Sequence, residues 1–257
     1  MKSDTVRFRL VGSEFEIRHP SAKVWDAVAD RLPPVEPSRS LAVCDRRYAA
    51  EPIDDGLLSV RRGRRRPVRA NTAAAAADLI VDDVSRFLSR RPNGPLFIHA
   101  GAVSWRGKAL LLPGKSGSGK SELVAALLHL GADYLSDEFA LLDRDGNVQA
   151  FPRPLALRQS GGSRRLRAEE LMARTDLLPI PVGEIAFLRY RGGATWAPRQ
   201  ISPGQAFLGL LRHMLSARQR LEAARPILRH IATSSIVFGG VRGEANEAAA
   251  RLIALLR

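Results

Sequence analysis

The feature that most constrains this chain of 257 residues is a glycine-rich run between two apolar stretches. Residues 109–112 are typical of a short buried strand, and apolar residues recur at helical spacing from Ser121 to Leu130. The run between them reads Gly114, Lys115, Ser116, Gly117, Ser118, Gly119, Lys120 and Ser121. Glycines let backbone N–H groups close around phosphate oxygens, and the N-terminus of a helix favours anions. The sequence therefore predicts a phosphate-binding loop between a strand and a helix.

Each residue type in this loop has an expected task. Lys120 reaches the β- and γ-phosphates of a nucleotide, and the Ser121 hydroxyl ligates Mg²⁺. We expect ATP to bind along the loop and into the first helical turn, over residues 114–122, which end at Glu122. The expected cofactors are therefore ATP and Mg²⁺.

Two adjacent acids, Asp137 and Glu138, follow Lys120 by one helix, one turn and one strand. Phosphoryl transfer needs a metal ion to neutralise charge and a group to orient the nucleophile. Asp137 and Glu138 are therefore candidate metal ligands together with Ser121, and one acid is a candidate proton acceptor. Because neighbouring strand residues point to opposite faces, both acids reach one site only at a strand end or bulge. The alternative is a solvent-exposed pair at a strand terminus.

His99 ends an apolar stretch at residues 96–98 and precedes the small residues Ala100, Gly101 and Ala102. Such a histidine, taken alone, is more often structural than catalytic. Because His99 precedes the loop and the acid pair in the chain, a catalytic role is the second interpretation.

The ordered set of Ile98-His99, the loop ending in Ser121-Glu122, and Asp137-Glu138 resembles the catalytic domain of HPr kinase/phosphorylase over roughly residues 96–158. The resemblance implies that His99 lies close to the transferred phosphate and that Asp137 is the general base toward a substrate serine. It implies that Glu138, where the family more usually has aspartate, is associated with the metal. Asp137, His99 and Lys120 are thus the implied catalytic residues.

The family's second signature, a Glu-Ile-Arg-Gly stretch that engages HPr, has no match, since residues 184–187 read Glu-Ile-Ala-Phe. Residues 135–142 and 151–157 look more like the divergent HPr-kinase-related proteins, which include kinases of lasso-peptide precursors. That similarity implies transfer to a serine-type hydroxyl of a peptide or protein, such as a C-terminal serine.

Basic residues follow the acid pair and are candidate substrate ligands: Arg153, Arg158, Arg164 and Arg165. Guanidinium groups bind phosphate and carboxylate in a bidentate manner. Residues 159–167 are rich in glycine and arginine and are expected to form a mobile loop over the substrate, although an exposed loop without that role fits equally well. Arg242, beside Gly243, is a weaker candidate of the same kind.

Composition limits the partners. The net charge of +14 favours anionic partners without choosing among them. Among the possible functions, a nucleic-acid-dependent ATPase ranks last, because no strand of four apolar residues runs into the acid pair. The single cysteine, Cys44, and the absence of an apolar leader or an 18-residue apolar run favour a cytoplasmic protein without a membrane segment. The family resemblance also suggests a homo-oligomer.

The expected fold is α/β (α+β), with an N-terminal α+β domain over residues 1–95 and a P-loop kinase catalytic domain over residues 96–257. In the second domain the pattern predicts strands at 96–104, 109–112, 134–142, 185–190 and 235–238, and helices beginning at Pro203, Arg218 and Glu244. Two other functions remain open: a small-molecule kinase on the same scaffold, and a nucleotide-binding regulatory module without transfer activity.

Overall fold

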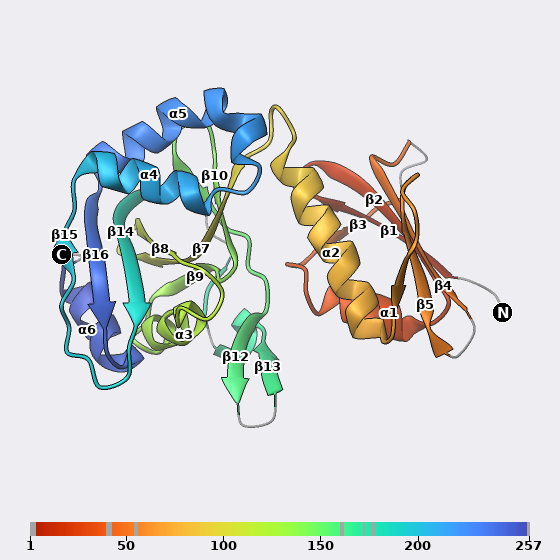
Figure 1. Cartoon of the computed structure of the whole chain (residues 1–257), viewed down its shortest axis with the longest axis horizontal. Coiled ribbons are helices and arrows are strands. Elements are labelled where there is room, and N and C mark those ends of the chain that lie inside the picture. Colours follow the sequence, from red (N-terminus) through yellow and green to blue (C-terminus); the bar gives the residue numbers. More distant parts are fainter. Residues whose placement is uncertain are drawn as a thin grey trace. The chain divides into compact units, whose positions relative to one another are not determined.

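The computed structural model describes residues 4–39, 43–53, 56–159, 162–171, 173–175 and 178–255. The chain divides into two compact units, residues 1–94 and 95–257, each with its own sheet (Figure 1). Within the described residues the fold is mixed α/β, with six α-helices, a mixed sheet of six strands and a mixed sheet of eight. The domain boundary expected from the sequence lies one residue from this division.

The N-terminal unit is a six-stranded sheet with two helices, in the strand order β3-β1-β2-β4-β5-β6. Its strands are β1 (Asp4–Leu10), β2 (Ser13–His19), β3 (Glu36–Pro37), β4 (Arg46–Pro52), β5 (Leu58–Arg62) and β6 (Val68–Ala70). Its helices are α1 (Ala22–Ala29) and α2 (Ala73–Ser89). Alternation along β1 and β2 buries Phe8, Phe15 and Ile17 completely, so the opening hairpin contributes one apolar face to the core.

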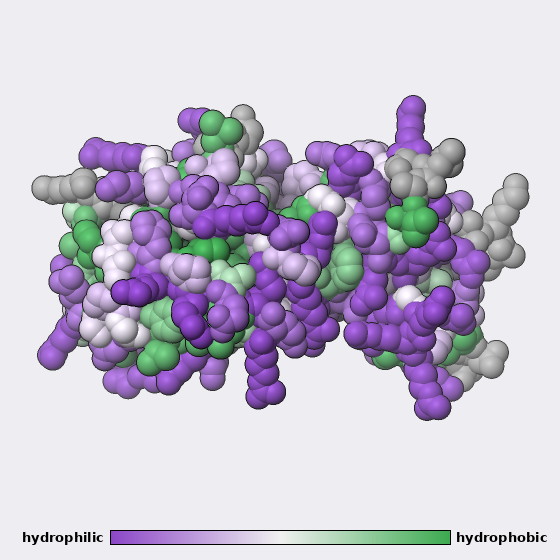
Figure 2. Space-filling model, turned by 90° about the horizontal axis from the view of Figure 1, so that it is seen from above, coloured by the Kyte–Doolittle hydropathy of each residue, from purple (hydrophilic) through white to green (hydrophobic). Residues whose placement is uncertain are grey.

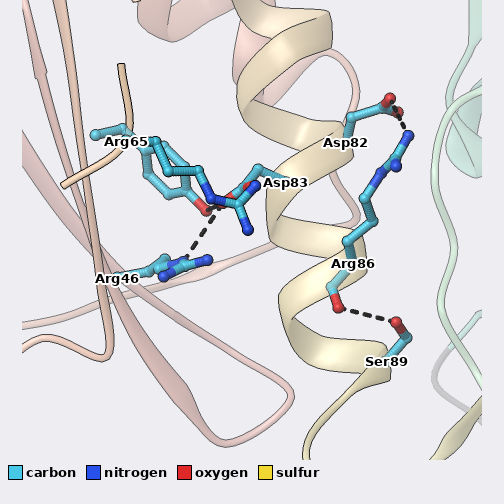
Figure 3. Close-up of polar contacts among 7 residues, drawn as sticks. Arg46, Arg65, Asp82, Asp83, Arg86 and Ser89 are labelled. Carbon is cyan, nitrogen blue, oxygen red and sulfur yellow. Dashed lines mark hydrogen bonds and ion pairs between the residues drawn. The ribbon is translucent and has the colours of Figure 1, made fainter. Parts of the chain in front are cut away.

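A buried acid ties α2 to the N-terminal sheet. Asp83 is 3% exposed and accepts a hydrogen bond from the Tyr48 hydroxyl at 3.2 Å. The guanidinium groups of Arg46 and Arg65 lie 3.4 and 3.3 Å from its two oxygens, and Figure 3 shows both arginines converging on it. Because the charge is paired and hydrogen-bonded, the buried carboxylate fixes the position of α2 on the sheet.

The C-terminal unit contains an eight-stranded sheet in the order β11-β10-β7-β8-β14-β16-β15, with β9 also paired to β7. The strands are β7 (Leu96–Trp105), β8 (Lys108–Pro113), β9 (Asp133–Ser136), β10 (Phe139–Leu142), β11 (Asn147–Gln149), β14 (Ile180–Tyr190), β15 (Arg199–Gln200) and β16 (Ile236–Arg242). Strand β14 runs parallel to both β8 and β16, so these three strands end at the same edge of the sheet. Strand β7 is antiparallel to β8.

Helices cover both faces of this sheet (Figure 1). On one face, α4 (Pro203–His213) and α5 (Ala217–Ser234) bury residues such as Leu210 and Leu228. On the other, α3 (Lys120–His129) and α6 (Ala245–Leu255) bury residues such as Leu127 and Leu252. The result is a three-layer arrangement, and the central strands are apolar on both faces, as burial between two layers requires.

The local signals in the sequence explain several boundaries. Helix α4 begins as expected at Pro203, because the Ser202 side chain accepts from the Gln205 N–H and the Gln205 side chain accepts from the Ser202 N–H. The expected strand at 134–142 is divided into β9 and β10, with Asp137 and Glu138 at the break.

The expectation of a mobile loop at residues 159–167 is wrong for the described part of that segment. Strands β12 (Leu155–Gln159) and β13 (Gly162–Leu166) pair as an antiparallel hairpin, and residues 160–161 lie outside the description. The hairpin forms because Leu155 is buried and Leu157 packs beside α3, which anchors one strand and lets the second pair with it.

The surface is mostly hydrophilic on the face drawn in Figure 2. Arg61, Arg64, Arg65 and Arg66, in the arginine-rich segment 61–66, are exposed. None of the helices in the described part of the chain is long and apolar enough to cross a membrane.

Candidate functional site

The glycine-rich run joins the end of β8 to the start of α3. Gly117 and Gly119 both have φ of +82°, and Gly119 is the N-cap of α3 in the left-handed conformation. The Gly114 N–H donates to the His99 carbonyl at 3.3 Å, which attaches the start of the loop to β7. The loop therefore leads directly into the N-terminus of a buried helix. Backbone N–H groups at such a helix start favour anions such as phosphate.

Lys120 is folded back over this loop. Its ammonium donates to the carbonyls of Gly114, at 2.8 Å, and Lys115, at 3.0 Å. Burial lowers the pKa of Lys120, while the nearby charges of Asp137 and Glu138 act in the opposite direction. The Lys120 ammonium group is thus held by two backbone carbonyls of the loop.

Asp137 lies beside the first turn of α3. The Ser121 hydroxyl donates to Oδ2 of Asp137 at 2.8 Å, whereas Oδ1 has no hydrogen-bond partner among the described residues. The residue is 7% exposed, and burial raises its pKa to about 6. A carboxyl group with a pKa of about 6 is ionised at neutral pH. Because this pKa lies near the working pH, the group can act as a general base.

Glu138 takes a different partner. Its Oε2 lies 2.7 Å from Nη1 of Arg153, and the Arg153 guanidinium lies 5.8 Å from the ring centroid of Phe139. Tyr134 donates from its hydroxyl to the Arg153 carbonyl at 2.5 Å. Arg153, a predicted substrate ligand, is thus next to the acids, where it is paired with one of them.

His99 occupies the middle of β7 and is half-buried. Its ring centroid lies 5.9 Å from that of Phe139, its partner on β10. Burial, followed by the charge of Lys120, lowers the pKa of His99 to about 4. The bridge between Ile98 and Met214 also places His213 beside it, and burial lowers the pKa of His213 as well. His99 is therefore an uncharged imidazole at neutral pH.

A cavity of about 620 Å³ joins these groups. Its walls include most of the residues expected from the sequence: Ser116, Gly117, Gly119, Lys120, Ser121 and Glu122 from the loop and helix, His99 from β7, and Asp137 and Glu138 from the break between β9 and β10. Gly114 and Lys115 shape the loop and accept the Lys120 hydrogen bonds without lining the cavity. Ser118 belongs to a smaller neighbouring pocket.

Two of the other predicted substrate arginines, Arg164 and Arg165, do not line the cavity. Arg164 lies on β13 and pairs with Glu170 at 3.4 Å, with both side chains half-exposed. Arg165 follows it on β13 and is partly buried. The side chain of Arg158 lies outside the described residues. Among the side chains that the structure describes, Arg153 contacts the acid pair through Glu138.

Sequence reasoning missed part of the cavity wall, which Tyr190, Glu244, Ala245 and Ala156 complete. Arg242, which the sequence offered as a weaker candidate, also lines the cavity; it is 2% exposed and donates to the carbonyls of Gly119 at 2.6 Å and Gly243 at 2.7 Å. The available signal was topological: parallel strands end at a common edge, so the ends of β14 and β16 must lie near the loop that follows β8.

The arrangement is suited to binding a phosphorylated ligand and to accepting a proton beside it. Within the described residues, no group of three or more His, Cys, Asp or Glu side chains is placed to hold a metal ion. Comparison with known proteins adds nothing to the geometry, since no family model and no curated protein matches the chain.

Proposed function

We propose that residues 95–257 form a P-loop kinase of the HPr-kinase-like kind, which transfers the γ-phosphoryl group of ATP to a serine-type hydroxyl of a peptide or protein. The observation that carries the proposal is the hydrogen bond from Ser121, the residue directly after the loop lysine, to Asp137. The pair joins a phosphate-binding helix start to a buried carboxyl group whose second oxygen has no hydrogen-bond partner among the described residues.

The residues have distinct tasks in this reaction. The loop N–H groups and Lys120 hold the phosphates and offset their charge. The acceptor oxygen forms a bond to the γ-phosphorus as the bond from that phosphorus to the β,γ-bridging oxygen breaks, and ADP leaves. Asp137 takes the proton of the hydroxyl. Uncharged His99 donates or accepts a hydrogen bond beside the transferred group without adding a charge.

A magnesium ion fits the donor set of this site. The free Oδ1 of Asp137 and the Ser121 hydroxyl are oxygen ligands of the type that Mg²⁺ prefers, and it usually keeps several waters beside one or two protein ligands. When bound, the ion neutralises charge on the β- and γ-phosphates. Glu138 is the third predicted ligand, and its pairing with Arg153 favours a contact through water.

The test of the proposal is Asp137→Asn, which keeps the shape and loses the proton acceptor. Turnover should fall by about 10²–10⁴-fold, the usual contribution of a general base. Binding of ATP in the absence of Mg²⁺, measured by calorimetry, should stay within about threefold, because a base acts in the transition state and the metal contact of Asp137 plays no part in this measurement. Asp133→Asn, at the start of the strand β9 that Asp137 follows and outside the cavity lining, is the matched control and should leave both values unchanged. Near-normal turnover of Asp137→Asn would remove Asp137 from this role.

The acceptor is tested separately. Synthetic peptides ending in serine, and the same peptides ending in alanine, are incubated with ATP and scored for the mass gain of one phosphate. We expect phosphorylation of the serine peptides only. Labelling of a metabolite pool, with both peptide sets inert, would instead favour a small-molecule kinase on this scaffold.

One observation favours a second function, a nucleotide-binding module without transfer activity. Arg153 engages Glu138, so one of the two acids is held in an ion pair. Under this alternative the protein binds ATP and forms no ADP with any hydroxyl acceptor, and Arg153→Ala leaves that result unchanged.

A further inference from the structure

The cavity continues past the phosphate loop on the side away from Asp137. Its walls there are Tyr190, at the end of β14, and Arg242, Glu244 and Ala245, at the end of β16 and the start of α6. These side chains have no part in the proton transfer described above, and they leave one end of the cavity without an assigned ligand.

The order of the strands in the sheet shows on which side of the loop that end of the cavity lies. In the sheet, β8 lies between β7 and β14, and the phosphate loop leaves from the end of β8. His99 lies on β7, and Asp137 follows β9, which pairs with β7. Tyr190 ends β14, on the other side of β8. A ligand with its phosphates on the loop and its reacting end toward Asp137 therefore directs its opposite end toward Tyr190.

The ring of Tyr190 is fixed against the loop. Its backbone N–H donates to the Ser118 carbonyl at 3.3 Å, and its hydroxyl donates to Oε1 of Glu244 at 3.0 Å. The Arg242 guanidinium, itself bonded to the Gly119 carbonyl, lies 5.3 Å from the ring centroid. Tyr190 is nevertheless 43% exposed. Its ring is therefore both fixed in position and accessible to a ligand.

We propose that Tyr190 and Glu244 bind the nucleoside end of the donor nucleotide. The base stacks on the exposed part of the Tyr190 ring, since every nucleobase has a π-face and aromatic rings stack on it. The Glu244 carboxylate accepts a hydrogen bond from an N–H or O–H group of the nucleoside, because an ionised carboxylate only accepts. This inference rests on the proposed function, in that it takes Asp137 to mark the reacting end.

The experiment compares ATP with tripolyphosphate, which has the phosphates and no nucleoside, by calorimetry on the full chain with Mg²⁺. The wild type should bind ATP at least about fivefold more tightly than tripolyphosphate. Tyr190→Ala should weaken ATP binding about 5–100-fold and change tripolyphosphate binding less than about twofold. Tyr190→Phe, which keeps the ring, should stay within about threefold of the wild type for ATP.

Glu244→Ala provides a second variant on an exposed residue, where folding is not at risk. It should weaken ATP binding and leave tripolyphosphate binding the same or tighter, because it removes a negative charge. Equal losses for both ligands in Tyr190→Ala would make the ring a support of the loop and overturn the nucleoside site. Unchanged ATP binding in Tyr190→Ala, or equal binding of the two ligands by the wild type, would overturn it too, with the kinase proposal intact. A wild type that binds neither ligand would overturn both.

Discussion

Asp137 is placed where burial and hydrogen bonding act on its pKa in opposite directions. Burial raises the pKa and the Ser121 hydroxyl lowers it, which leaves a value of about 6. Below pH 6 the carboxyl group is protonated and cannot accept a proton from a substrate hydroxyl. We therefore expect kcat/KM to fall about tenfold per pH unit below pH 6 and to level off above it, as the pH profile of a free enzyme reports its essential base.

The control for this profile is His99→Asn. The pKa of His99 is about 4, so the imidazole stays uncharged over the range measured and its removal should leave the acid limb in place. A limb that disappears in His99→Asn would assign the titration to the histidine. A profile that stays flat down to pH 5 would contradict the assignment to Asp137.

At the residue scale, spacing along the chain predicted which side chains meet in the fold when they are separated by few elements. The loop, Lys120, Ser121 and Asp137 are joined by one helix and one strand, so their proximity follows from local geometry. Tyr190 and Glu244 were missed because their contact links residues 54 positions apart and depends on two strands being neighbours in the sheet. The ion pair of Arg153 with Glu138 was missed for another reason: side-chain partners are decided by packing, which spacing along the chain does not reveal.

At the element scale, the start of α3 depends on a glycine that no other residue replaces without cost. Gly119 has φ of +82°, and a Cβ there would come within 2.5 Å of Nη2 of Arg242 and 3.2 Å of Cβ of Tyr190. Arg242 is buried and bonded to the Gly119 carbonyl, so it has little room to move. Gly119→Ala should weaken ATP binding at least about tenfold, or about 1.4 kcal/mol, by displacing the loop.

The matched control is Gly107→Ala, in the turn between β7 and β8. Its φ of +77° is similar, and a Cβ there would meet nothing within 4 Å. This variant carries only the backbone penalty of about 1–2 kcal/mol for a left-handed residue, and its ATP binding should match the wild type. Denaturant unfolding and calorimetry measure the two effects. Equal ATP binding in both variants would show that the contact with Arg242 does not shape the loop.

The hairpin of β12 and β13 shows why composition misled the prediction at this scale. Glycine, serine and arginine are typical of loops, and the run at 159–167 has little else. Pairing is determined by the neighbouring strand, in which Leu155 is buried and the backbone is extended. By contrast, α4 was predicted to its first residue because a proline at the first helical position is a local signal.

At the scale of the whole molecule, a buried acid links stability to pH. Glu184 on β14 is 1% exposed, and neither carboxyl oxygen has a hydrogen-bond partner among the described residues. Burial raises its pKa to about 8 from 4.5. The folded chain therefore holds a proton that the unfolded chain loses above pH 4.5, so this contribution to stability is complete at low pH and is lost as the pH rises through 8.

We expect Glu184→Gln to remove this dependence. Relative to the variant, the wild type should lose about 3 to 5 kcal/mol of unfolding free energy between pH 4.5 and 9, at 1.36 kcal/mol per pKa unit. Urea unfolding of both proteins at several pH values measures the difference. Glu222→Gln, an exposed control on α5, should keep the wild-type slope. Parallel curves for the wild type and Glu184→Gln would show that Glu184 is ionised in the folded protein.

The bond between Arg242 and Gly119 has a consequence for the order in which the protein is made. The two residues are 123 positions apart, and Arg242 lies on β16. A ribosome releases the glycine-rich loop long before it releases the arginine that supports it. Because domains complete their folding as units, the loop reaches its final shape only after β16 has been synthesised. Nascent chains that stop short of β16 should therefore be unable to hold nucleotide.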